Sequence, residues 1–232
     1  TQRLIPVHEH NERRAVGQVL ALLAAGQSLA LTCDAGTPAI SDPGALLVAA
    51  VRSAGFPVTP VPGPNAAVAA LSASGITAPH FLFYGFLPER AAARRRALAA
   101  LAKLPFTLVF YEAPHRITES VADLRAALGD SRRIVFAREL TKLFETLHEC
   151  SLADAETWLG SDANQRKGEF VLILEGTDGA AETDNGSAQR ALAVLLEALP
   201  LKQAVDLAAK ITGGRKNELY KLALELKKGR ES

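Results

Sequence analysis

The chain has 232 residues, of which 48% are hydrophobic, and its 26 Lys or Arg against 25 Asp or Glu give a net charge of +1. This composition is that of a globular protein with one or two domains, and it excludes a disordered chain, a collagen-like fibre and a disulfide-rich scaffold. No apolar stretch approaches the ~20 residues of a membrane span, no signal peptide opens the chain, and Cys33 and Cys150 lie far apart, so we expect a cytoplasmic protein without membrane contact.

Residues 1–78 are predicted to form an N-terminal α/β domain. Helical patterns alternate there with apolar runs of strand length. The predicted helices lie at residues 11–25, 42–55 and 66–75, and the predicted strands lie at residues 28–33 and 57–61. Because strands that alternate with helices usually belong to a parallel sheet with right-handed crossovers, we expect a parallel sheet in this domain.

A second α/β domain is predicted over residues 79–176, followed by a linker and a helical module. Its strands are predicted at residues 81–86, 106–112, 133–138, 142–148 and 169–175, and its helices at residues 89–104, 115–128 and 152–159. Residues 177–187 are polar and lack an apolar period, which predicts the linker. Residues 188–232 are predicted to form a helix-turn-helix-like module, with helices at residues 188–199, 201–211 and 216–228.

Two loops of the first domain follow predicted strands, at the ends of the strands where open α/β sheets bind their ligands. The loops are residues 32–44 and 62–67, and both contain glycine and small residues that let a ligand approach the backbone. Neither has the glycine spacing of a phosphate-binding loop, so we expect a nucleotide-like ligand without phosphates. The alternative is that both are ordinary helix starts, with Asp42 as an N-cap and Pro43 at the first helical position.

A series of motifs runs in a fixed order from about His8 to Lys228. The motifs are Asp34-Ala35-Gly36-Thr37-Pro38, Ile40-Ser41-Asp42-Pro43-Gly44, Pro62-Gly63-Pro64-Asn65-Ala66, Gly85-Phe86-Leu87-Pro88, Phe110-Tyr111-Glu112-Ala113-Pro114-His115-Arg116, Ala137-Arg138-Glu139-Leu140-Thr141-Lys142 and Lys167-Gly168-Glu169. Together they resemble the bacterial small-subunit ribosomal RNA cytidine 2′-O-methyltransferase family. The resemblance implies the tetrapyrrole-methylase fold, with two α/β domains, a cleft between them and a small helical C-terminal module.

The beginning of the chain departs from this family. Family members begin with a first strand that carries an Ala-Thr-Pro-Ile-Gly-Asn-like loop, followed by an Ala-Glu-Asp-Thr-Arg-like segment, and this sequence starts after both. The chain also contains no Met. We therefore expect that the first strands of the N-terminal domain are missing, together with part of the cleft, and that the chain is shorter than the enzyme it came from.

The resemblance implies that S-adenosylmethionine, the methyl donor, binds in the cleft and that no metal is required. By motif position, the donor-binding residues would be Asp34, Ala35, Gly36, Thr37, Ile40, Asn65, Ala66, Tyr111 and Glu112. The donor has a sulfonium centre and a zwitterionic tail, for which carbonyls, a carboxylate and helix-start amides are suitable partners. The resemblance also implies a homodimer whose partner is ribosomal RNA in the small ribosomal subunit.

The sequence leaves the proton acceptor and the RNA-binding surface open. A 2′-hydroxyl must lose its proton during methylation, and the candidate bases at predicted strand ends are Glu112, His115, Lys142 and Glu145. Positive charge is concentrated in residues 90–103 and 202–230, which favours contact with phosphates. The predicted RNA-binding residues are Arg94, Arg95, Arg96, Arg116, Arg138, Lys142, Arg215 and Lys216. The alternatives are a structural ion-pair network and a solvated helix face.

Two other functions stay open at this point. The first is a small-molecule tetrapyrrole (corrin) methylase, which shares the two glycine-containing loops but would need no basic patches. The second is a catalytically silent RNA-binding fragment, because the chain is expected to lack the first strands of the family.

Overall fold

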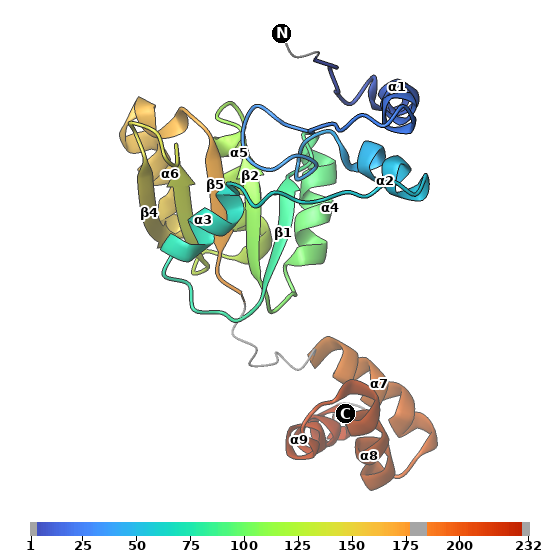
Figure 1. Cartoon of the computed structure of the whole chain (residues 1–232). Coiled ribbons are helices and arrows are strands. Elements are labelled where there is room, and N and C mark those ends of the chain that lie inside the picture. The colour runs from blue at the N-terminus through green and yellow to red at the C-terminus, as the bar shows by residue number, and fades with distance from the viewer. Residues whose placement is uncertain (1–3, 177–184, 229–232) are drawn as a thin grey trace. The chain divides into compact units, whose positions relative to one another are not determined.

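The computed structural model describes residues 4–176 and 185–228, which belong to two compact units (Figure 1). The first unit is Thr1–Gly176 and the second is Thr177–Ser232. Each unit has its own buried apolar core. Among the described helices, none is long and apolar enough to cross a membrane. The predicted domain boundary at residue 78 falls inside the first unit.

The beginning of the first unit contains three helices. They are α1 (Glu12–Ala24), α2 (Ala45–Ser53) and α3 (Ala66–Ala73). Helices α1 and α2 pack together through Val19, Leu47 and Val51, with Leu31 and Phe56 packed against this cluster. The three helices were expected from the periodicity of the sequence, with slightly different ends.

The prediction of strands at residues 28–33 and 57–61 is wrong. Both segments are irregular, and neither is paired with another strand of the described residues. An apolar run of strand length becomes a strand only when a neighbouring backbone satisfies its N–H and C=O groups. The parallel sheet expected in residues 1–78 is therefore not formed by the described residues, and the first unit is built on one sheet.

That sheet has five strands in the order β1-β2-β5-β3-β4. The strands are β1 (Phe81–Phe86), β2 (Thr107–Glu112), β3 (Arg133–Arg138), β4 (Thr146–Ser151) and β5 (Phe170–Leu174), and the helical segments between them are α4 (Ala91–Leu101), α5 (Ile117–Leu128), α6 (Leu152–Ser161) and a short 3₁₀ helix, η1 (Ala163–Arg166). Strands β1 and β2 are parallel, whereas β5 is antiparallel to both β2 and β3, and β4 is antiparallel to β3. The carboxyl ends of β1, β2 and β3 therefore share one edge with the amino end of β5.

Strand β4 lies further along the chain than the predicted strand at residues 142–148. Glu139 and Thr141 have φ angles of 51° and 65°, a left-handed backbone that does not continue a strand. The Thr141 N–H donates to Glu145 Oε2 at 2.6 Å, which closes a tight loop. Strand β4 begins only after this loop, at Thr146, and ends at Ser151, the N-cap of α6.

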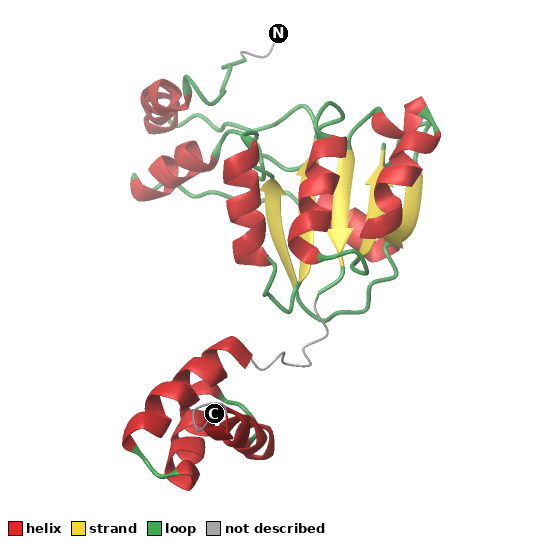
Figure 2. Ribbon diagram, turned by 180° about the vertical axis from the view of Figure 1, so that it is seen from behind, coloured by secondary structure: helices red, strands yellow, loops and turns green. Residues whose placement is uncertain are grey.

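Helices cover both faces of the sheet (Figure 2). Helices α4, α5 and α6 pack on one face, against strand residues such as Phe110. Helix α3 packs on the other face through Ala67 and Ala70, against strand residues such as Val109. Successive residues of a strand point to opposite faces of the sheet. Since helices cover both faces, the central strands have apolar residues on both sides.

The second unit is a module of three helices. They are α7 (Asn185–Ala198), α8 (Leu201–Thr212) and α9 (Lys216–Lys228). Its core contains Leu192, Val205, Ala208, Leu219 and Ala223. Helix α8 ends at Gly213, whose φ of 70° is the left-handed conformation typical of a helix C-cap. Of the predicted linker, residues 177–184 lie outside the described residues, and residues 185–187 belong to α7.

Candidate active site

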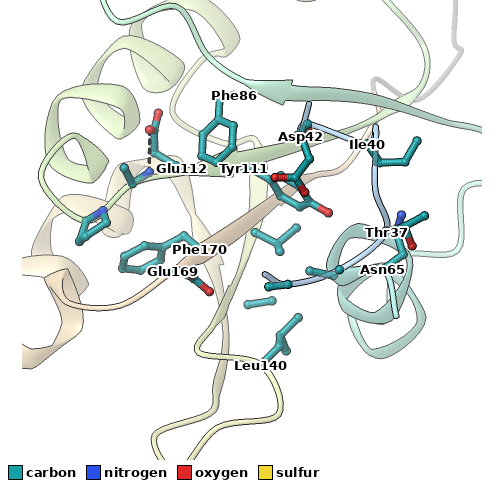
Figure 3. Close-up of a pocket in the computed structure, with 18 of the residues that line it drawn as sticks. Thr37, Ile40, Asp42, Asn65, Phe86, Tyr111, Glu112, Leu140, Glu169 and Phe170 are labelled. Atoms are coloured by element: carbon teal, nitrogen blue, oxygen red, sulfur yellow. Dashed lines mark hydrogen bonds between the residues drawn. The ribbon is translucent and has the colours of Figure 1, made fainter. Parts of the chain in front are cut away.

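A cavity of about 520 Å³ opens at the edge of the sheet where β1, β2 and β3 end (Figure 3). Its volume is in the range of small-ligand and cofactor sites. Every predicted donor-binding residue except Asp34 lines it, namely Ala35, Gly36, Thr37, Ile40, Asn65, Ala66, Tyr111 and Glu112. The two loops that the sequence analysis singled out therefore converge on one cavity with the end of β2.

The first of these loops has an uncommon backbone conformation. Gly36 has a φ of 76°, and Ala39 and Ser41 have φ angles of 68° and 61°, although residues with side chains rarely adopt this region. Such strain persists where surrounding contacts hold it, and it concentrates at functional sites. One such contact is the Thr37 hydroxyl, which donates to the Pro64 carbonyl at 2.8 Å and joins the first loop to the second.

Asp42 contributes its side chain to the cavity because another residue caps the following helix. The N-cap of α2 is Gly44, not Asp42. The buried carboxylate of Glu12, on α1, accepts hydrogen bonds from the N–H groups of Gly44 at 3.0 Å and Leu47 at 3.1 Å. A carboxylate is favourable at a helix N-terminus, so Glu12 performs the role that the helix-start alternative gave to Asp42.

The second loop is fixed to strand β2 through helix α3. Asn65 is the N-cap of α3, and its side chain accepts a hydrogen bond from the Val68 N–H at 3.1 Å. The Ala67 N–H, in the first turn of α3, donates a hydrogen bond to Tyr111 Oη at 3.2 Å. Burial raises the pKa of Tyr111, and the negative charge of Asp42 raises it further. The Tyr111 phenol therefore keeps its proton at neutral pH and retains an O–H group that can donate to a ligand.

Glu112 and Arg116 form a buried ion pair, with Arg116 Nε 3.1 Å from Glu112 Oε1. The Glu112 carboxylate also accepts from the Ala113 N–H at 2.8 Å and from the Ser120 hydroxyl at 2.6 Å. Arg116 donates in addition to the Leu87 carbonyl. The predictions of Glu112 as a base and Arg116 as an RNA contact are therefore corrected: the pair joins the end of β1 to the start of α5.

Two other candidate bases, Lys142 and Glu145, are held by the loop at residues 139–145. Lys142 Nζ lies 2.9 Å from Glu139 Oε1 and 3.0 Å from Glu169 Oε2, and these hydrogen bonds raise the pKa of Lys142. Lys142 is therefore an ammonium at neutral pH and cannot accept a proton. Glu145 accepts the Thr141 N–H and does not line the cavity.

His115 is the remaining candidate base. It precedes α5, follows Pro114 and lines the cavity. Its imidazole makes no hydrogen bond or ion pair with the residues that the structure describes. Imidazole is the most common general base in enzymes, so this side chain is suited to that chemistry. The described residues contain no group of His, Cys, Asp and Glu that could hold a metal ion.

The rest of the cavity wall consists of residues that the sequence did not indicate as site residues. The residues not singled out are Ser41, Asp42, Phe86, Ala113, Pro114, Ala137, Leu140, Glu169, Phe170 and Val171. Most of them lie inside the motifs that carry the family resemblance, which was the available signal. Gly168 shows why one motif contains glycine: it has a φ of 88°, and a Cβ there would overlap the side chain of Glu139.

Two of the predicted RNA-binding arginines are buried, and those predictions are corrected. Arg94 is 1% exposed, and its Nε lies 2.7 Å from Asp123 Oδ2. Arg138 is 8% exposed and donates to the backbone carbonyls of Asn164 and Lys167. Both guanidinium groups hold elements of the fold together and are not available to an RNA phosphate.

The remaining predicted RNA-binding cations are exposed: Arg95, Arg96, Lys142, Arg215 and Lys216. Lys142 is paired with Glu139 and Glu169. Three others have carboxylate neighbours, with Arg95 at 3.5 Å from Asp123, Arg215 at 3.8 Å from Glu218 and Lys216 at 2.7 Å from Asp206. Arg96 makes no ion pair within the described part of the chain. Each therefore remains a predicted RNA contact.

The fold and the cavity define a methylase of the tetrapyrrole class. Residues 3–156 match the family model of Tetrapyrrole (Corrin/Porphyrin) Methylases, and residues 182–227 match that of the RsmI C-terminal HTH domain. The methyltransferase CobJ has the same fold, with a TM-score of 0.54 and 21% identity over 70% of each chain. Uroporphyrin-III-C-methyltransferase from Thermus thermophilus gives a TM-score of 0.51 and 21% identity, over 77% of this chain and 76% of that chain. The predicted fold class is confirmed.

Curated relatives define the family within this class. Proteins named Ribosomal RNA small subunit methyltransferase I from Escherichia coli O157:H7, Pseudomonas aeruginosa and Xylella fastidiosa (strain Temecula1) are 49%, 50% and 51% identical to this chain. The matches cover 96%, 96% and 94% of this chain and 78%, 79% and 80% of those proteins. The chain belongs to the ribosomal RNA small subunit methyltransferase I family, as its motifs predicted.

Proposed function

We propose that this protein transfers a methyl group from S-adenosylmethionine to the ribose 2′-hydroxyl of a cytidine in small-subunit ribosomal RNA. The observation that carries the proposal is the cavity, whose wall is formed by two glycine-containing loops, which include Asp42, and by His115 after the end of β2. The family membership supports ribosomal RNA as the acceptor. The corresponding partner is the small ribosomal subunit in the cytoplasm, and we propose a homodimer as the acting form.

The cavity residues fit the donor. Gly36 and Ala66 leave the backbone open to a ligand, and the Ala66 N–H, at the N-terminus of α3, can donate to the donor's carboxylate. Asp42 supplies a negative charge for the cationic part of the donor. When bound, S-adenosylmethionine supplies an electrophilic methyl group on a sulfonium. The chain's own task is to orient the two reactants, exclude water and accept one proton.

His115 is proposed to accept the proton of the 2′-hydroxyl. It lines the same cavity as the donor-binding loops, whereas Glu112 is held in a buried ion pair and neither Lys142 nor Glu145 lines the cavity. Tyr111, with its raised pKa, acts instead as a hydrogen-bond donor in the cavity wall. Proton transfer to a positioned imidazole needs no metal ion.

The Asp42→Asn substitution is expected to weaken binding of S-adenosylmethionine about 10- to 100-fold, since a hydrogen bond to a charged group contributes ~1.5–3 kcal/mol. The dissociation constant would be measured by isothermal titration calorimetry. Asp34→Asn is the matched control, because Asp34 belongs to the same loop but does not line the cavity. Equal donor affinities for Asp42→Asn and the unaltered protein would remove Asp42 from the donor site.

The double substitution of Arg90 and Arg96 with Ala is expected to weaken RNA binding and to flatten its dependence on salt. Both arginines are exposed and make no ion pair with the described residues. Each lost phosphate contact reduces the slope of log K against log salt by ~0.7–0.9. Arg125→Ala is the control, because Asp130 and Glu156 already neutralise that arginine. Binding of small-subunit RNA across a salt series measures the slopes, and identical slopes would exclude this surface.

A competition between acceptors tests the proposed function against the small-molecule alternative. Small ribosomal subunits that lack the modification and a corrin-type tetrapyrrole would be offered separately with labelled donor. We expect label only in the ribosomal RNA. Label only in the tetrapyrrole would refute the proposed acceptor, and failure of the folded protein to bind the donor would support the silent RNA-binding fragment.

A further inference from the structure

Phe86 is a half-exposed aromatic side chain in the wall of the cavity. It is the last residue of β1, and it is 50% exposed. Its ring contacts the ring of Tyr111 in a T-shaped arrangement, with centroids 5.6 Å apart and an interplanar angle of 65°. Figure 3 shows the two rings side by side, near Asp42. A single exposed phenylalanine is ordinary on a surface, but this one lines a ligand cavity.

The position of Phe86 is fixed from both sides. Its backbone is in register with Tyr111 in the parallel pair of β1 and β2. The next residue, Leu87, is 1% exposed, and its carbonyl accepts a hydrogen bond from Arg116, which Glu112 holds in turn. The ring is therefore presented to the cavity by a rigid segment, as expected of a preorganised binding surface.

We infer that Phe86 is the surface on which the base of the acceptor cytidine stacks. This inference rests on the proposed function, because it requires a nucleotide as the acceptor. A ribose that reacts inside a cavity belongs to a nucleotide that has left the RNA stack, and unstacked bases are held on aromatic side chains. Stacking on Phe86 thereby replaces the stacking that the cytosine base loses when it leaves the RNA. It also positions the ribose of that nucleotide near His115, which lines the same cavity.

The surroundings of Phe86 favour the acceptor over the donor. The polar and small residues suited to the donor, such as Gly36, Asn65 and Asp42, come from the two loops, whereas Phe86 comes from the end of β1. Arg90, at the N-cap of α4, lies four residues beyond Phe86 in sequence, is exposed, and makes no ion pair with the residues described. A cation for an RNA phosphate therefore follows the aromatic surface in the same segment.

Steady-state methylation of small ribosomal subunits that lack the modification tests this role. Phe86→Ala is expected to raise the KM for the subunits about 5- to 100-fold, the range for loss of one base–aromatic stack. Phe86→Trp should restore the KM to within about threefold, because indole also stacks on bases. Phe81→Ala is the matched control, since Phe81 is 48% exposed at the other end of the same strand and does not line the cavity.

Calorimetry with S-adenosylmethionine separates stacking of the base from contact with the donor. The affinity of Phe86→Ala for the donor should equal that of the unaltered protein. An unchanged KM for the subunits, or a KM that Phe86→Trp fails to restore, would overturn the inference, and so would a loss of donor affinity. If the unaltered protein binds the donor but methylates no ribosomal RNA, the proposed function itself fails.

Discussion

Replacing His115 with alanine is expected to lower kcat for methyl transfer by a factor of about 10² to 10⁴, the usual contribution of a positioned general base. The reason is that His115 lines the cavity, whereas Glu112 is held by Arg116 and Ser120, and Lys142 by Glu139 and Glu169. Donor affinity should change little, because the imidazole is assigned to the acceptor. Single-turnover transfer of labelled methyl to small ribosomal subunits measures the effect on the chemical step.

A comparison with a second candidate base sharpens this prediction. Lys142→Gln is the comparison variant, because Lys142 is already protonated and paired in the folded protein. A kcat for His115→Ala within about threefold of the unaltered value would show that another group accepts the proton.

Replacing Arg94 with alanine is expected to lower the free energy of unfolding by about 3–5 kcal/mol, the cost of breaking a buried ion pair by removing one partner. Arg94 is 1% exposed and lies 2.7 Å from Asp123, so the substitution leaves a largely buried carboxylate without its principal partner and opens a cavity between α4 and α5. Urea unfolding followed by circular dichroism gives the free energy of unfolding.

The neighbouring Arg96 provides the control. Arg96→Ala should change the free energy of unfolding by less than about 0.5 kcal/mol, because Arg96 is exposed and makes no ion pair with the described residues. The double replacement Arg94→Met with Asp123→Leu should recover much of the loss, since no buried charge is left alone. Equal stabilities of Arg94→Ala and Arg96→Ala would contradict the structural role of Arg94.

The helical pattern itself contained a signal for the burial of Arg94. Arg94, Leu98 and Leu101 follow the i, i+4, i+7 spacing of one helix face, and all three are buried. The adjacent Arg95 and Arg96 obscure this periodicity, because residues 94–96 form one basic run in the sequence. A charged side chain is buried in the core only when a partner of opposite charge, here Asp123, is close to it. Because Asp123 lies 29 residues from Arg94 in the sequence, local sequence patterns do not reveal this pair.

Strands of the sheet could be predicted where apolar runs have neighbours to pair with. The predicted bounds of β1 and β3 agree with the structure, because each strand has a neighbour: β1 pairs with β2, and β3 pairs with both β4 and β5. The apolar runs at residues 28–33 and 57–61 have the same local character but no strand beside them among the described residues. Strand pairing is a long-range property, and the sequence pattern alone does not contain it.

The candidate site was predictable at the level of loops and less so at the level of side chains. The loops around Gly36 and Asn65 could be located because glycine and small residues follow apolar runs there and because their motifs carry the family resemblance. The sequence did not predict that Glu12 rather than Asp42 caps α2, because the capping contacts join residues more than 30 positions apart. The sequestration of Glu112 was not predicted either, because it depends on the side-chain contacts that Ser120 and Arg116 make in the folded chain.

The most direct test of the proposed reaction is to identify the methylated nucleoside. Unmodified small ribosomal subunits would be incubated with the protein and labelled S-adenosylmethionine, and the RNA would be digested to nucleosides for mass spectrometry. The proposed function predicts label in 2′-O-methylcytidine, lost in His115→Ala. Label on a cytosine base, on another nucleoside or only on a tetrapyrrole offered in parallel would contradict it.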